Sequence, residues 1–224
     1  INSLSVALLT SIFGTIISYG SALVTCRSNV NKRLKLIIES ISVVTNTIPG
    51  MVIGIAFLIT FSGTSIQNTF FILIICNIIH FFSTPYLMIK NSLSKLNESF
   101  ETTAKLLGDS YIKTIVRVVT PNIKSTLFEV ISYYFINSMV TISAVIFITS
   151  ANTMVITTKI KELQHYAKFD EIFVLSILIL LTNVVAKLLC SLLSNKEKAI
   201  GYIKNINKKE KKSNMKLKSK FVTS

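Results

Sequence analysis

The segment from Glu101 to Pro121, ETTAKLLGDSYIKTIVRVVTP, is the longest polar interval inside an otherwise apolar chain. It carries five charged side chains, and its proline, Pro121, follows its one glycine, Gly108, by thirteen residues. On both sides the sequence returns to long apolar runs. The segment is therefore a loop between apolar elements, with local structure of its own.

Local signals in this loop predict two short helices joined by a turn. Asn97 is a suitable N-cap for the first helix. Gly108 suits the left-handed position that follows a helix, and Asp109 or Ser110 can cap the second helix. We expect the second helix to end at Pro121, because proline has no N–H to donate.

The first helix has an unusually small patch, formed by Thr102, Thr103 and Ala104. Small side chains leave the helix backbone accessible, which suits insertion into a groove on another protein. An ordinary connecting loop explains the same residues. The physical chemistry of the loop leaves both interpretations open.

The composition predicts a polytopic membrane protein. Half of the 224 residues are hydrophobic and only 15% are charged, and the mean hydropathy is +0.61. Crossing the hydrocarbon core of a bilayer takes about 20 apolar residues in a helix. We expect an all-α fold, because helices satisfy their own backbone hydrogen bonds in lipid. The predicted transmembrane helices cover about 4–26, 36–61, 69–89, 127–149 and 172–193.

The net charge of +14 is distributed in a way that indicates membrane topology. Lys and Arg are numerous between the first and second apolar runs, absent between the second and third, and again numerous in the loop 91–125. They are fewer before the fifth run, and ten lysines follow in 194–224. Cytoplasmic loops are the basic ones. We therefore place residue 1 outside the cell and the C-terminus in the cytoplasm, and exclude nucleic acid as a partner.

Two features of the chain ends follow from this topology. An outside N-terminus without a signal peptide predicts that these residues are part of a longer chain with an earlier transmembrane helix. The lysine-rich segment 194–224 is low in complexity, so we expect a disordered cytoplasmic arm attracted to anionic lipid headgroups. The transmembrane domain itself is residues 1–193.

Four residues inside the apolar runs are candidates for a translocation pathway: Pro49, Gly50, Asn77 and His80. Pro49 and Gly50 interrupt the second run, where a helix bends beside either a neighbour or a cavity. Asn77 and His80 are polar groups in the third run, and such groups are either functional or satisfied by packing. We interpret Lys187 as a side chain that reaches back to the cytoplasmic surface.

No set of residues in the sequence indicates an enzyme. There are only two histidines, and the acidic residues are scattered. The G-x-x-x-x-G-K-[ST] motif that binds nucleotide phosphates is absent. Neither a metal site nor a bound cofactor is expected. If ATP drives this protein, another chain binds it.

The loop resembles the cytoplasmic "EAA" loop in the membrane subunits of binding-protein-dependent ABC importers. That loop contains Glu-Ala-Ala, three residues, Gly, and a proline thirteen residues later. Thr102 stands at the Glu position, Thr103 and Ala104 at the two alanines, and Gly108 and Pro121 at the glycine and proline. The resemblance extends to TIPGMVIGIAF and covers about residues 2–193.

The departures from this pattern concern the acidic residue. The family's Glu is replaced by Thr102, although Glu101 precedes it. A shift by one residue turns a side chain about 100° around a helix. The contact with the ATPase is then altered or lost.

The resemblance implies a MetI-like permease fold in the bacterial cytoplasmic (inner) membrane. It implies that the 98–121 loop, with Glu101, Thr102, Thr103, Ala104, Gly108, Asp109 and Pro121, docks on a cytoplasmic ATPase dimer, which binds ATP and Mg²⁺. A second permease domain, as a fused half or a separate subunit, and an external solute-binding protein complete the importer. The segment TISAVIFITSANTMVITTKI is similar to importers of iron(III) and of 2-aminoethylphosphonate, some of which are fused permeases. This chain would then be the C-terminal half.

Two other functions remain open from the sequence. An ion-driven secondary carrier would keep charged residues at mid-membrane and often shows internal repeats. A membrane assembly protein that transports nothing would use the small-residue loop for docking only.

Overall fold

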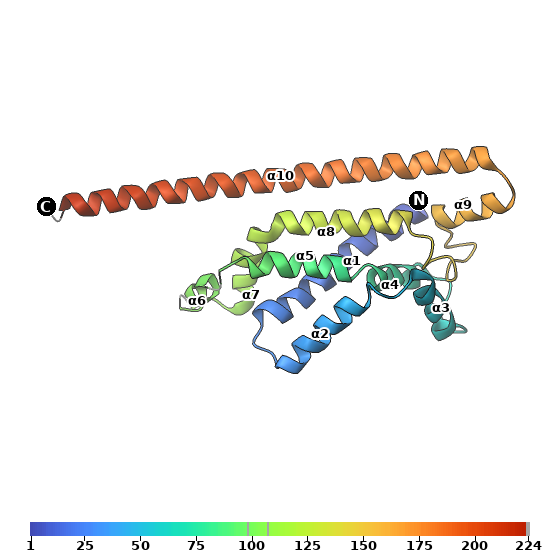
Figure 1. The fold of residues 1–224 in the computed structure, drawn as a ribbon, viewed down its shortest axis with the longest axis horizontal. Coiled ribbons are helices and arrows are strands. Elements are labelled where there is room, and N and C mark those ends of the chain that lie inside the picture. The colour runs from blue at the N-terminus through green and yellow to red at the C-terminus, as the bar shows by residue number, and fades with distance from the viewer. Residues whose placement is uncertain (98, 107, 223–224) are drawn as a thin grey trace.

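The chain is helical through most of the part that a computed structural model describes, namely residues 1–97, 99–106 and 108–222, without the side chains of 100, 101, 105 and 198–222. The side chain of Glu101 therefore lies outside the described set. Figure 1 shows the helices as one elongated bundle. In chain order they are α1 (Asn2–Arg27), α2 (Lys32–Val44), α3 (Gly50–Phe61), α4 (Phe70–His80), α5 (Ser83–Ser94), α6 (Ser99–Leu106), α7 (Tyr111–Thr114), the π-helix η1 (Ile115–Val119), α8 (Thr120–Val140), α9 (Ile156–His165) and α10 (Phe169–Val222).

The all-α prediction is confirmed, but the prediction of five transmembrane helices is wrong in its detail. Within the described residues, two helices are long and apolar enough to span a membrane: α1, and α10 between Phe169 and Glu197. A third span results if α4 and α5 count as one helix bent by 55°. The apolar runs are thus broken more often than their composition indicates.

Two physical causes account for the difference between the predicted and the observed helices. The predicted helix 36–61 is divided because Pro49 is the N-cap of α3, where its missing N–H costs nothing. The predicted helix 127–149 begins earlier, at Thr120, and ends at Val140. Lys124 and Glu129 lower the hydropathy of α8, and the apolar residues after Val140 form turns instead of a membrane span.

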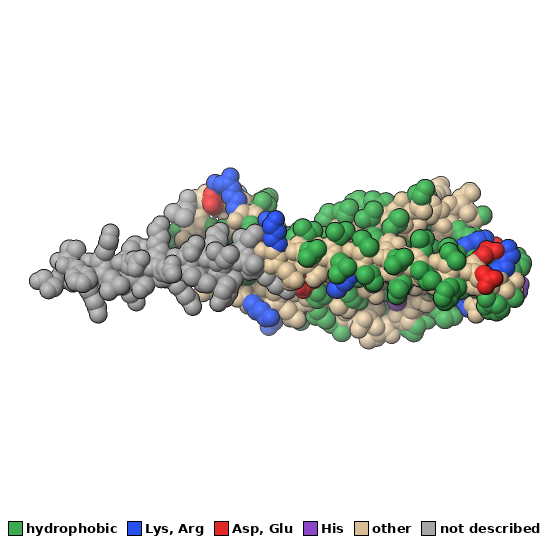
Figure 2. Space-filling view, turned by 90° about the horizontal axis from the view of Figure 1, so that it is seen from above, with side chains coloured by type: hydrophobic (Ala, Val, Ile, Leu, Met, Phe, Trp, Pro, Cys, Tyr) green, Lys and Arg blue, Asp and Glu red, His purple; other side chains and the backbone are tan. Residues whose placement is uncertain are grey.

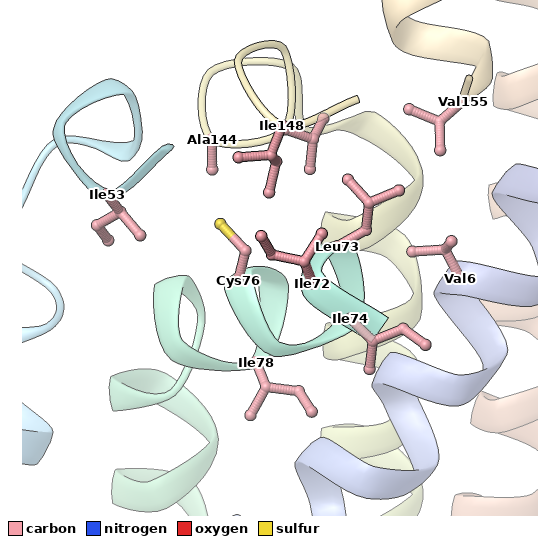
Figure 3. Packing of buried hydrophobic residues seen from close by; sticks show 11 residues of the cluster. Val6, Ile53, Ile72, Leu73, Ile74, Cys76, Ile78, Ala144, Ile148 and Val155 are labelled. Atoms are coloured by element: carbon pink, nitrogen blue, oxygen red, sulfur yellow. The ribbon is translucent and has the colours of Figure 1, made fainter. Parts of the chain in front are cut away.

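Those apolar turns close one end of the core (Figure 3). Ala144 and Ile148 lie over Ile72 and Cys76 of α4 in this view, and all four side chains are buried. Val6 of α1 belongs to the same cluster. Hydrophobic composition alone does not distinguish such a returning segment from a transmembrane helix, since both bury their apolar side chains.

α1 packs closely against α8. A Cβ atom built on Gly14 would lie 2.8 Å from the Tyr134 ring, and Ser18 Oγ and Tyr134 Oη share a hydrogen bond of 2.8 Å. Small and hydroxyl-bearing residues permit this close approach of helices in lipid. The serine and glycine content of α1 therefore serves helix packing.

The two ends of the bundle differ. α6, α7 and the connection between α1 and α2 lie toward one end, whereas the N-terminus, α3 and α9 lie toward the other (Figure 1). Along the described part of α10, hydrophobic side chains cover much of the face that Figure 2 shows, and charged groups gather where the helix begins. These side chains are largely exposed, as in Phe173, Leu181 and Leu188. An exposed apolar helix of this kind suits contact with lipid or with another membrane helix.

We expected 194–224 to be disordered, whereas the backbone of α10 continues as a helix through Val222. Lysine and glutamate are good helix formers. Extension of an existing helix also avoids the cost of nucleation.

Candidate coupling loop and pathway site

The candidate coupling loop, residues 98–121, has the turn that its glycine predicted. Gly108 has φ +79°, the left-handed region. Directly after it, the Asp109 N–H donates to the Ala104 carbonyl at 3.0 Å, which closes the C-terminal turn of α6. A Cβ atom on Gly108 would meet nothing within 4 Å. Glycine is therefore required here by the backbone conformation and not by lack of space.

Side chains hold the helices on both sides of this turn. Asn97 Oδ1 accepts a hydrogen bond from the Ser99 N–H at 2.9 Å. Ser110 is the N-cap of α7, and its Oγ accepts from the Lys113 N–H at 3.4 Å. Asp109 forms an ion pair with Lys113. The predicted capping residues thus occupy their positions, with Ser110 as the cap and Asp109 in the ion pair.

The small patch divides between the two sides of α6. Ala104 is buried, whereas Thr102 and Thr103 are exposed. The Thr103 hydroxyl donates to the Ser99 carbonyl at 2.8 Å and so covers part of the backbone. The exposed side of the loop is also apolar, because Leu106 is 83% and Ile112 73% exposed. We had not included these two among the candidate site residues, although exposed apolar side chains can indicate an interaction surface.

Pro121 lies inside a continuous helical run from Tyr111 to Val140, so the prediction that it ends the second helix is wrong. The π-helix η1 precedes it, and the Thr120 N–H donates to the Ile115 carbonyl, five residues back. Proline normally clashes with the preceding turn of an α-helix. A wider π-turn accommodates such a disruption. The loop is therefore joined to α8 by helix, without a flexible break.

Arg27 connects the loop to α1. Its Nη2 atom donates to the Leu96 carbonyl at 2.7 Å and also to the Leu93 carbonyl. These carbonyls lie in the last turn of α5 and just after it, and the Leu93 carbonyl also accepts from the Leu96 N–H. A cation is favourable at this end of a helix. The side chain fixes the point at which the chain leaves α5 for α6.

The pathway candidates Gly50 and His80 lie together. A Cβ atom on Gly50 would contact Ser143 Oγ and would lie 3.0 Å from the imidazole of His80. One turn later, a Cβ atom on Gly54 would meet the Ala144 carbonyl. The glycine face of α3, which begins after Pro49, therefore packs on α4 and on the returning segment 141–155.

Asn77 and His80 precede the bend between α4 and α5. Asn77 is 1% exposed and donates to Ser138 Oγ of α8 at 3.1 Å. Its Oδ1 atom and the Nδ1 atom of His80 are buried without a hydrogen-bond partner among the described residues. The His80 and Phe81 rings lie 4.4 Å apart. The four predicted pathway residues thus belong to the junction of α3, α4 and the segment after α8.

A second polar site was missed. Glu129 of α8 and Lys187 of α10 line one pocket of about 420 Å³, together with Ser132, Asn137, Ser191 and Asn195. We had interpreted Lys187 as a snorkelling side chain and had given Glu129 no role. The available signal was an ionisable residue inside each of two apolar runs.

Comparison with known proteins finds a matching family and similar curated proteins. Residues 11–198 match the family described as "Binding-protein-dependent transport system inner membrane component". The ferric transport system permease protein FbpB of Actinobacillus pleuropneumoniae is 28% identical over 154 residues, which are 68% of this chain and 22% of that protein. FbpB 1 of Haemophilus influenzae, also described as a ferric transport system permease, is 27% identical over 66% of this chain and 23% of its own length. The chain spans about a fifth of the length of these relatives.

Solved structures share the fold. A bacterial ABC transporter involved in the import of the acidic polysaccharide alginate has a TM-score of 0.72 at 18% identity, over 87% of this chain and 77% of that chain. The MetNI methionine ABC transporter in an inward-facing conformation has a TM-score of 0.71 at 13% identity, over 88% of this chain and 93% of that chain. These likenesses confirm the MetI-like fold, and the family is one of non-catalytic membrane components. With residues 11–198 matched, the chain belongs to the family of binding-protein-dependent transport system inner membrane components.

Proposed function

We propose that this chain is the permease part of an ABC importer and that the 98–121 loop couples it to a separate ATPase. The observation that carries the proposal is the loop itself. A short helix, α6, exposes Thr102, Thr103 and Leu106 at one end of the bundle, and Gly108 turns the chain directly afterwards. Family membership supports this use of the loop.

The geometry explains how a movement of the loop would reach the transmembrane helices. α7, η1 and α8 form one helical run from Tyr111 to Val140, and Tyr19 of α1 shares a hydrogen bond of 2.7 Å with Thr120 at the start of α8. Arg27 holds the other side of the loop. A displacement of α6 would therefore move α8 and α5 together, with α1 between them.

The mechanism follows from two states of the importer. ATP and Mg²⁺ bind to the partner ATPase dimer, and closure of that dimer displaces α6 in each of two permease domains. The permease changes between an outward-open and an inward-open arrangement, and a ligand bound elsewhere shifts the balance. Thr102 in place of the family's glutamate removes a charge from this contact. Exposed apolar side chains such as Leu106 supply contact area there.

We propose the orientation of the bundle in the membrane from its charge distribution. We place the end that carries α6 and the α1–α2 connection in the cytoplasm, since basic residues gather there. The N-terminus and α9 then face outward in the cytoplasmic membrane. α9 and the adjoining segment form the surface that we assign to the solute-binding protein.

The substrate that the curated relatives favour is iron(III), because both are described as ferric transport permeases. The alternative, 2-aminoethylphosphonate, rests on the resemblance of residues 141–160. The two solutes differ in charge and chemistry, so one transport assay separates them.

Reconstitution of the full-length permease with its ATPase and solute-binding protein in proteoliposomes tests the function. We expect uptake of radiolabelled iron or 2-aminoethylphosphonate that needs internal ATP and the ATPase subunit. An ionophore should leave that uptake unchanged. Uptake that an ionophore abolishes, and that persists without the ATPase, would establish an ion-driven carrier instead.

A further inference from the structure

The start of α1 is tied to residues 150–156, the segment that leads into α9 and is here called the outer segment. The Asn2 amide donates to the Asn152 carbonyl at 3.3 Å and to the Met154 carbonyl at 3.1 Å. These contacts join parts of the chain that are 150 and 152 residues apart. The outer segment is therefore held by α1 as well as by its neighbours in sequence.

Ser3 caps α9 from a different helix. Ile156 is the first residue of α9, and the N–H groups in the first turn of a helix have no intrahelical acceptor. Ser3 Oγ accepts a hydrogen bond from the Ile156 N–H at 2.7 Å. Val6 of α1 is buried in the same cluster as Val155 of the outer segment (Figure 3). The position of the first turn of α9 thus depends on α1.

At its other end, α1 holds the chain that leads to α6. Arg27, the last residue of α1, donates to the carbonyls of Leu93 and Leu96. α1 is an uninterrupted helix of 26 residues without proline, and it extends about 39 Å. In Figure 1 it begins near α9 and runs toward the end of the bundle that carries α6 and α7. One continuous helix is therefore fastened at both of its ends.

Between these ends, α1 contacts the helical run on the other side of the coupling loop. Ser18 shares a hydrogen bond of 2.8 Å with Tyr134, and Tyr19 shares one of 2.7 Å with Thr120 at the start of α8. Arg27 contacts the chain before α6, whereas Tyr19 contacts the chain after it. A displacement of α1 therefore reaches the loop from both sides.

This arrangement suits communication between two partners at opposite ends of the bundle. A ligand that favours one of two states shifts the binding of any other ligand that distinguishes those states, and the effect is reciprocal. Such coupling needs an element whose equilibrium both sites bias. α1 has hydrogen bonds to the outer segment at one end and to the base of the loop at the other. It can therefore be that element.

We propose that Asn2 and Ser3 are positioning residues through which α1 transmits docking of the solute-binding protein at α9 to the ATPase at α6. The inference rests on the proposed function for the identity of these two partners. It adds the route by which the outer partner regulates the inner one.

A second route runs through α8. The Thr157 hydroxyl of α9 donates to the Thr141 carbonyl, directly after α8, at 2.9 Å. This is one hydrogen bond, whereas Asn2 and Ser3 together make three to the outer segment. α1 also reaches both sides of the coupling loop. These contacts favour α1, and Thr157→Val tests the other route.

ATP hydrolysis by the full-length transporter in lipid nanodiscs is the first measurement. Rates are compared with and without its solute-binding protein, loaded with iron(III) or 2-aminoethylphosphonate. We expect docking to raise the wild-type rate about fivefold or more, and to raise that of Ser3→Ala or Asn2→Leu less than about twofold. The rate without the binding protein should equal that of the wild type in both variants. Ser5→Ala, at an exposed serine of the same helical turn, is the matched control and should respond as the wild type does.

Three further measurements separate transmission from a structural role. Ser3→Thr keeps the hydroxyl acceptor and should restore the increase in hydrolysis. Trapped ATP should change the affinity of the solute-binding protein in the wild type but not in Ser3→Ala, because coupling is reciprocal, whereas the nucleotide-free affinity should be equal in both. The double variant Ser3→Ala with Arg27→Ala should lose no more of the increase than either single variant, because both interrupt one connection.

Several results would overturn the inference. These are a wild-type increase in Ser3→Ala and Asn2→Leu, loss of the increase in Thr157→Val alone, and a fall in the rate without the binding protein. Loss of nucleotide-free docking in the variants would also do so, since Asn2 and Ser3 would then only shape the docking surface.

ATP-dependent uptake, measured in parallel, separates this inference from the importer function. Uptake by the wild type with no effect of the Asn2 and Ser3 variants on hydrolysis removes the inference alone. Uptake by a wild type whose hydrolysis does not respond to the binding protein does the same. Absence of both uptake and response in the wild type removes the importer function together with the inference.

Discussion

The guanidinium group of Arg27 lies 2.7 Å from the Leu96 carbonyl, which fastens the end of α1 to the segment that leads into α6. A hydrogen bond from a charged group contributes about 1.5–3 kcal/mol. We expect Arg27→Ala to reduce transport about tenfold or more while ATP hydrolysis continues, since the loop is then less firmly held. Arg33→Ala, on the exposed start of α2, is the matched control. Equal uptake in both variants would contradict the role of Arg27.

Gly108 gives a prediction that depends on backbone conformation alone. Its φ of +79° is unfavourable for residues with a Cβ, at about 1–2 kcal/mol, although open space surrounds it. Gly108→Val should therefore uncouple ATP hydrolysis from transport without loss of membrane insertion. Gly108→Asn, which tolerates the left-handed region, should retain most coupling. The ratio of solute transported to ATP hydrolysed is the measurement, and normal coupling in the valine variant would be inconsistent with this account.

Two glycines of α1 form a matched pair for stability. A Cβ atom on Gly14 would overlap the Tyr134 ring, whereas one on Gly20 would meet nothing within 4 Å. Overpacking costs about 1–3 kcal/mol, so Gly14→Val should lower the Tm in detergent and Gly20→Val should not. A Tm that falls equally in both would show that the α1–α8 contact is not responsible, because Gly→Val raises helix propensity at both positions.

Gly54 tests the contact between α3 and the segment 141–155. A Cβ atom there would meet the backbone carbonyl of Ala144, which cannot move aside as a flexible side chain can. Gly54→Ala should push α3 away from the segment 141–155 and reduce uptake severalfold. Gly20→Ala is the control, because it adds the same methyl group in open space. Wild-type uptake by Gly54→Ala would mean that this contact does not matter for transport.

The local features of the fold could be predicted because single residues determine them. Gly108 is left-handed and Ser110 is a cap, each for a reason visible in the sequence. The arrangement of the apolar runs could not be predicted from the sequence. Residues 141–149 have the composition of a transmembrane helix, and only their packing on α4 distinguishes them. Pro121 was misjudged because the π-turn that accommodates it depends on the helix on both sides.

The candidate sites also differ in whether local sequence could reveal them. The candidate coupling loop was predicted from its spacing and its small residues, which are local features, and its role stays a prediction. The approach of Gly50 to His80 and the pocket between Glu129 and Lys187 each join residues from helices far apart in the sequence. Periodicity places a residue on a face of its own helix but does not say which helix faces it.

The most direct test of the central claim is a cross-link from α6. A photo-reactive amino acid at Leu106, which is 83% exposed, is compared with one at Tyr166, which is 64% exposed beside α9 at the opposite end. In membranes of cells that express the whole transporter, we predict that Leu106 cross-links to an ATP-binding subunit and that Tyr166 does not. The Leu106 cross-link should also change in yield when ATP is trapped. A Leu106 variant that joins no ATPase, or a Tyr166 variant that does, would contradict the account.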